Sequence, residues 1–225
     1  FSYILKNIFI NKMSKDGNSK IWIACFDIGK KNFAFNIDEV DIDKLQSIKT
    51  VPFNERYMKN GTPTSDFYKT ITKVSKSIKT LRIENTDLTY GCNKKDYLDP
   101  RVYLNMYTVL DKYKDTWDKC SVFIIEQQMS FGRQKNNTMA LKLGQHCYSY
   151  FLFNYGVFKE VMEFPAYHKT KVLGAPKKMS KPERKDWAVE KAMSILSQRG
   201  DGEILDKLSS RKKRDDMSDC ILMSM

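Results

Sequence analysis

Two carboxylates in this sequence each end an apolar run that alternates like a β-strand. In IWIACFDIG, the two-residue period of a strand places Asp27 on one face with Ile21, Ile23 and Cys25. The run SVFIIEQQ delivers Glu126 in the same way. An acid at the end of a buried strand is costly unless it is paired, protonated or metal-bound, so Asp27 and Glu126 indicate a site.

Two further acids, Asp216 and Asp219, lie three residues apart in KKRDDMSD and would share one face of a helix. Asp215 precedes this pair and leaves the register ambiguous, although helical spacing favours Asp216. Four such carboxylates could hold two divalent ions ~4 Å apart, which activate a water, neutralise a phosphate and support a leaving 3′ oxygen. Carboxylate oxygens suit Mg²⁺, and Mn²⁺ should substitute for it. The chemistry would be phosphodiester hydrolysis.

Each acid also has an ordinary structural explanation. Asp27 and Glu126 could be strand-end acids whose carboxylates reach solvent. Asp216 and Asp219 could belong to a solvated helix start, where acids complement the positive end of the helix dipole. The proposed site requires instead that all four side chains converge in space.

The composition points to one folded domain with a polyanionic partner. The chain has 225 residues, 41% of them hydrophobic and 12% aromatic, and a formal net charge of +12. Nucleic acid is the first candidate partner, although a basic surface can also serve solubility or bind acidic membranes. Five widely spaced cysteines and two histidines argue against a structural zinc site and suit reduced thiols in an intracellular protein. The apolar run FSYILKNIFI is too short to span a membrane, so we expect no membrane partner.

The elements that must position these residues begin with an expected antiparallel meander of three strands, at 20–28, 33–38 and 47–53. Residues 54–99 mix glycine, proline and many charges, and we interpret them as an insertion. Residues 1–19 are expected to be an N-terminal extension, either ordered or disordered, outside the domain that fills the rest of the chain.

Helices and strands then alternate. Ser180 and Glu183 have capping-box spacing and predict the start of a helix. The expected helices span 100–117, 137–154, 181–198 and the residues from Asp215 onward, the expected strands end at Glu126 and span 156–164, and 200–210 is a linker. This order is typical of a ribonuclease H-like α/β fold, in which helices flank a mixed five-stranded sheet.

Five motifs occur in the order found in the Holliday junction resolvases: FDIGKKNFAF, IEQQ, NNTMALKLGQ, PAYHKTKVLG and KKRDDMSD. The chain resembles that family over about 20–225, apart from 54–99. ALKLGQ is similar to the helix of bacterial RuvC, whereas FDIGKKN and the terminal acidic motif look closest to the resolvases of poxviruses and other large DNA viruses.

This resemblance implies a magnesium-dependent endonuclease that resolves four-way DNA junctions by paired symmetric nicks and acts as a homodimer through the helix at 137–154. It assigns the two metals to Asp27, Glu126, Asp216 and Asp219. Lys169 matches a catalytic lysine, and either Lys181 or Lys185 resembles a second basic position. A viral protein of this kind would act in a host cytoplasmic replication factory or nucleus. The alternatives are a ribonuclease H-like enzyme that cuts RNA/DNA hybrids or other branched DNA, and a non-catalytic junction-binding scaffold.

A candidate phosphate track runs from Pro165 to Lys185, which contains seven Lys or Arg residues and one acid. Contacts of this kind give affinity that falls with salt and little sequence choice; the alternative is a solvated charged loop. Phe131 lies in the loop where RuvC has an aromatic residue that probes the junction, although it could equally be ordinary packing. The predicted DNA-binding residues are Phe131, Arg133, Lys135, Lys169, Lys171, Lys177, Lys178, Lys181, Lys185 and Lys213.

Overall fold

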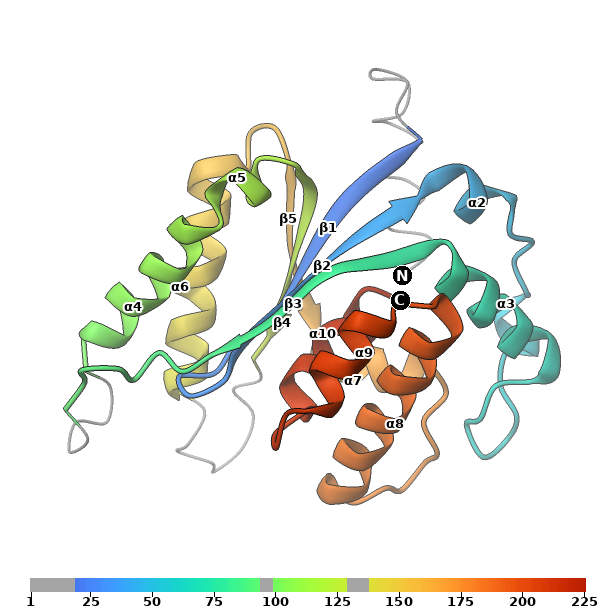
Figure 1. The fold of residues 1–225 in the computed structure, drawn as a ribbon. Helices are drawn as coiled ribbons and strands as arrows, with labels where there is room; N and C mark the ends of the chain where they lie inside the picture. The colour runs from blue at the N-terminus through green and yellow to red at the C-terminus, as the bar shows by residue number, and fades with distance from the viewer. Residues whose placement is uncertain (1–18, 94–98, 129–137) are drawn as a thin grey trace.

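A five-stranded mixed sheet forms the centre of the protein (Figure 1). The computed structural model describes residues 19–93, 99–128 and 138–225, so the expected extension at 1–19 lies outside the described residues except for Ser19. The strand order is β3-β2-β1-β4-β5. Strands β1 to β3 are antiparallel, and β1–β4 and β4–β5 are parallel, as the ribonuclease H-like prediction requires. The strands are β1 (Lys20–Asp27), β2 (Phe33–Asp41), β3 (Ile78–Thr86), β4 (Cys120–Gln127) and β5 (Glu160–Pro165).

Helices cover both faces of the sheet and enclose two separate apolar cores. On one face lie α4 (Arg101–Lys112), α5 (Lys114–Trp117) and α6 (Thr138–Tyr155), over a core rich in aromatic side chains. On the other face lie α3 (Ser65–Lys76), α7 (Ala166–Val172), α8 (Lys181–Arg199), α9 (Gly202–Ser209) and α10 (Asp215–Met223).

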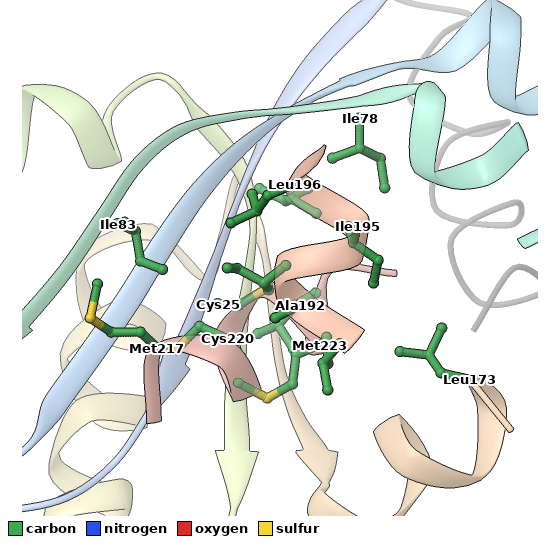
Figure 2. Close-up of a cluster of buried hydrophobic side chains, with 14 of the residues drawn as sticks. Cys25, Ile78, Ile83, Leu173, Ala192, Ile195, Leu196, Met217, Cys220 and Met223 are labelled. Carbon is green, nitrogen blue, oxygen red and sulfur yellow. The ribbon is translucent and has the colours of Figure 1, made fainter. Parts of the chain in front are cut away.

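Helix α10 is held against the sheet by its apolar side chains. Cys220 and Met217 are fully buried and lie with Cys25 of β1 in one cluster, as Figure 2 shows. Burying these side chains against β1 places the start of α10 near the carboxyl end of that strand.

Within the described ranges, no helix combines the length and the apolar character needed to cross a bilayer.

The predicted third strand at 47–53 is wrong. Helix α2 (Ile42–Ser47) begins instead directly after β2, where the Asp41 side chain accepts a hydrogen bond of 3.0 Å from the Lys44 amide, and η1 (Phe53–Glu55) follows. The third strand is β3, so the segment 54–99, predicted as an insertion, supplies an edge of the sheet. A register shift opposite Ile37 and Asp38 breaks the two-residue alternation of β3, which hid it in the sequence.

The predicted linker at 200–210 is also wrong, because α9 occupies most of it. Gly200 adopts φ 78° and ends α8, and the next helix begins two residues later. Leu208 of α9 is fully buried, which anchors this short helix to the core. The predicted capping box is confirmed: the Ser180 hydroxyl accepts from the Glu183 amide, and the Glu183 carboxylate accepts from the Ser180 amide.

A buried ion pair joins the end of α8 to the sheet. The Arg199 and Asp38 side chains are both fully buried, and their nearest nitrogen and oxygen atoms lie 3.7 Å apart. Arg199 also donates to the Ser75 carbonyl at 3.2 Å and to the Thr80 hydroxyl at 3.0 Å. Burial raises the pKa of Asp38, and the guanidinium opposes that shift. Arg199 therefore holds α8, β2 and β3 together through a charge that cannot be solvated.

We expect Arg199→Met to destabilise the protein by about 3–5 kcal/mol, because it leaves Asp38 buried without its counter-charge. Urea unfolding at neutral pH measures this loss. Lys69→Met is the control, since it breaks an ion pair with Asp66 in which the side chains are 67% and 79% exposed and which contributes little. Equal losses in the two variants would contradict the assignment.

Candidate functional site

Two of the four predicted acids meet at the carboxyl ends of two neighbouring inner strands. Strands β1 and β4 are parallel neighbours with Phe26 opposite Ile125, so Asp27 and Glu126 follow side by side at the carboxyl ends. Both residues are only 8% exposed. The alternative that these are strand-end acids reaching solvent is therefore wrong.

Lys169 links this pair of acids to α10. Its Nζ atom lies 2.6 Å from Glu126 Oε1 and 2.7 Å from Asp219 Oδ2, and its side chain is 6% exposed. Helix α7 begins directly after β5, which pairs with β4, and so brings Lys169 over the end of the sheet. The ammonium thus bridges carboxylates that are 93 residues apart in the chain.

The position of Gln128 was missing from the sequence-based site. Its Nε2 atom donates to Glu126 Oε2 at 3.2 Å, while Lys169 contacts the other oxygen of the same carboxylate. Both Glu126 oxygens are therefore held. The two-residue alternation that identified Glu126 also places Gln128 on its face and could have revealed it.

The pKa shifts reflect burial and mutual repulsion of the acids. Burial and the Glu126 charge raise the pKa of Asp27 well above its usual value. Burial would also raise the pKa of Glu126, but the Lys169 charge and the hydrogen bonds from Asp27, Lys169 and Gln128 together lower that pKa. Burial raises the pKa of Asp219 to about 6, against the opposing charge of Lys169. For Lys169, burial disfavours the ammonium, yet the surrounding carboxylates dominate and raise its pKa. The cluster thus favours a bound cation.

Asp216 and Asp215 have different partners. Lys213 donates a hydrogen bond to Asp216. The negative charge of Asp216 contributes to the raised pKa of Asp219, so these two acids are electrostatic neighbours. Lys185 of α8 donates to Asp215. These pairings support the register in which Asp216 accompanies Asp219. They also distinguish Lys185 from Lys181, because Lys185 is the one of the two that contacts an acid of α10.

The donor set fits a hard divalent cation in chemistry and charge. Asp27, Glu126, Asp216 and Asp219 present oxygen atoms alone, which Mg²⁺ prefers. When all are ionised, their charge of −4 and the +2 of Lys169 and Lys213 leave −2. In the described part of the chain, no three His, Cys, Asp or Glu side chains are arranged closely enough to hold a metal ion. Because Lys169 lies between two of the acids, metal binding requires local rearrangement of these side chains.

The predicted DNA-binding lysines have different environments. Lys171, Lys177, Lys178 and Lys181 are exposed on and after α7. Lys185 and Lys213 are paired with the acids of α10, and Lys169 is buried. Phe131, Arg133 and Lys135 lie outside the described residues.

Comparisons with known proteins identify viral relatives. The chain is 33% identical over 221 residues to the uncharacterized protein 170L of Invertebrate iridescent virus 6, covering 89% of this chain and 86% of the relative. It is also 33% identical to the uncharacterized protein 97L of Invertebrate iridescent virus 3, covering 89% and 96%. No protein-family model matches the chain.

Among solved structures, the yeast mitochondrial Holliday junction resolvase Ydc2 matches with a TM-score of 0.50 and 13% identity, over 90% of this chain and 75% of that one. The Fowlpox virus resolvase, solved with Holliday junction DNA, matches with a TM-score of 0.49 and 20% identity, over 89% and 91%. The likeness to Ydc2 shows a shared fold and confirms the fold expected from the sequence motifs.

The raised pKa of Asp219 predicts how stability depends on pH without metal. An unfolded aspartate titrates near 3.9 and the folded one at about 6, so the folded state binds the extra proton between these values. The free energy of unfolding should therefore fall as pH rises through this window. Because the Asp219 side chain is one quarter exposed and partly screened by solvent, we expect a total decrease of about 2 kcal/mol.

We expect Asp219→Asn to remove this dependence. In urea unfolding with EDTA, its stability relative to the wild type should increase by about 1 kcal/mol between pH 5 and pH 8. The exposed Asp206→Asn is the control, because a solvated carboxylate has no burial penalty. A constant difference between Asp219→Asn and the wild type would contradict the assignment.

Proposed function

The chain belongs to the same family as proteins 170L and 97L of the invertebrate iridescent viruses, and we propose that it is a structure-selective endonuclease that resolves four-way DNA junctions. The observation that carries this proposal is the buried contact of Lys169 with Glu126 and Asp219, beside Asp27, at the carboxyl edge of the sheet. Burying several acids around one lysine is energetically costly, and such a group suits phosphodiester chemistry.

The residues of the site have separable roles in this proposal. Held by Asp27, Glu126, Asp216 and Asp219, Mg²⁺ would polarise the phosphate and supply an activated water. Lys169 orients Glu126 and Asp219 before DNA binds, and its ammonium can then offset charge on the scissile phosphate. The low exposure of Asp27 and Glu126 keeps bulk water away, which strengthens each of these interactions.

The basic surface supports a DNA substrate. The exposed lysines between Lys171 and Lys181 follow directly from the helix that carries Lys169, so DNA phosphates bound there lie close to the acids. Contacts of this kind recognise the backbone rather than the bases. Branch geometry, rather than sequence, then selects the substrate. An intracellular location, in the cytoplasm or nucleus where such DNA occurs, is part of the proposal.

We also propose a homodimer formed through the end of α6. Phe153 is 95% exposed, and Leu152, Val157 and Phe158 are 48%, 85% and 81% exposed. Apolar side chains gathered at one helix end are typical of an interaction surface. A two-fold dimer would present two sites to strands related by the symmetry of a four-way junction and so make paired symmetric nicks.

Cleavage of a synthetic four-way junction with Mg²⁺ or Mn²⁺ tests the nuclease proposal. We expect paired symmetric nicks, and a loss of at least about 100-fold in rate for Asp27→Asn, because one metal ligand is removed. The exposed Asp43→Asn should retain the wild-type rate. No cleavage by the wild type at any metal concentration would overturn the proposal.

Two further measurements separate the alternatives. Faster cleavage of an RNA/DNA hybrid than of the junction would identify a ribonuclease H-like enzyme with another substrate. Isothermal titration with Mg²⁺ tests for a non-catalytic scaffold, which should give no metal-linked heat that disappears in Glu126→Gln. The exposed Glu160→Gln is the matched control for that titration.

The dimer surface gives a separate prediction. Phe153→Asp places a charge at the proposed contact, so light scattering after size exclusion should show a dimer for the wild type and a monomer for the variant. Tyr90→Asp changes an aromatic residue that is 87% exposed elsewhere and should leave the dimer intact. A wild type that is monomeric at all concentrations would contradict this assembly.

A further inference from the structure

A basic cavity of about 490 Å³ lies between residues 53–61 and 170–184. Lys171, Lys177, Lys178 and Arg184 line it, and the lining residues, all within the described ranges, include no acid. Its volume falls in the range of about 300–1,000 Å³ that is typical of small-ligand sites. An anionic occupant is therefore favoured.

Phe53 adds an aromatic surface to this cavity. The residue is 71% exposed although its side chain is large and apolar. The Arg56 guanidinium lies 5.7 Å from the centroid of the Phe53 ring, and the same arginine donates to the Val51 carbonyl at 2.8 Å. The ring is thus supported from its own segment. A supported aromatic ring beside several cations is the combination that binds single-stranded nucleic acid, by stacking one base and pairing its phosphates.

The two walls of the cavity are fastened together. The Tyr57 hydroxyl donates a hydrogen bond to the Val172 carbonyl at 2.9 Å, and the Lys177 backbone amide donates one to the Asn60 carbonyl at 3.3 Å. Gly174, at φ 75°, lies so close to Pro63 that an added Cβ would be 2.2 Å from the proline Cδ. The cavity is therefore formed before any ligand binds, which lowers the entropic cost of binding.

Lys178 adopts a backbone conformation that a lysine rarely has. Its φ is 66°, the single positive value among the described residues other than glycine. Strained residues of this kind concentrate at functional sites. A glycine would adopt the same backbone without strain. The presence of a strained lysine therefore suggests that its side chain has a function.

We propose that this cavity holds one unstacked nucleotide of the DNA strand that enters the active site, with its base on Phe53 and its phosphates on the surrounding cations. This inference rests on the proposed function. Thr170 and Lys171 line the cavity and directly follow Lys169 on α7, so the nucleotide would lie near the scissile phosphate. Bases next to a branch point unstack more readily than bases inside a duplex, so the cavity contributes to branch selection.

The test uses four-way junctions with 2-aminopurine near the crossover, mixed with the full chain in EDTA to prevent cleavage. An unstacked base captured by Phe53 should change its fluorescence at one position. Phe53→Ala should abolish that change and weaken binding about 10-fold, whereas Phe53→Tyr should retain both. Tyr90→Ala, which removes an exposed aromatic ring elsewhere, is the control.

Lys178→Gly supplies a second variant that suits the observed backbone. We expect weaker junction binding and a salt dependence reduced by about one counterion, while the exposed Lys79→Ala leaves both nearly unchanged. If the wild type cleaves junctions but Phe53→Ala keeps the fluorescence change and the affinity, the nucleotide pocket is wrong and the nuclease proposal stands. If the wild type binds and shows the Phe53-dependent change but never cleaves with metal, the nuclease proposal fails and the pocket stands.

Discussion

The contact of the Lys169 ammonium with Glu126 and Asp219 is the interaction on which the candidate site and the elements around it depend. Without a cation between them, these acids and Asp27 would be buried like charges at the end of a sheet, and repulsion would push α10 away from β1. Lys169 makes the arrangement stable in the absence of metal. In the proposed function, the same ammonium would become available to a phosphate once a divalent ion neutralised the carboxylates.

The fold supports this contact from three directions. Parallel pairing of β1 with β4 puts Asp27 beside Glu126, the apolar packing of α10 presents Asp219 to them, and α7 follows β5 closely enough to deliver Lys169. The Arg199–Asp38 pair fixes the carboxyl end of α8 to β2. Helix α8 also carries Lys185, which donates to Asp215, so the helix that Arg199 anchors contacts the first turn of α10 as well.

The sequence was informative where one local period decides the structure. Alternation identified Asp27 and Glu126, and helical spacing identified Asp216 with Asp219, because each pattern is contained within one element. The sequence does not reveal the edge strand β3 because a register shift interrupts its period, and it does not reveal α9 because Gly200 and Gly202 stand at the start of that short helix. The cavity at Phe53 had no sequence signal, since its two walls are more than 100 residues apart and meet only through tertiary packing.

The close approach of Gly174 to Pro63 has a consequence for how this protein can change over generations. Any side chain at 174 would meet both a left-handed backbone and the proline ring, so that position is restricted to glycine for as long as Pro63 stays in place. The short segment before α3 and the loop after α7 are therefore sterically coupled. Among relatives, we expect Pro63 and Gly174 to be retained together or substituted together.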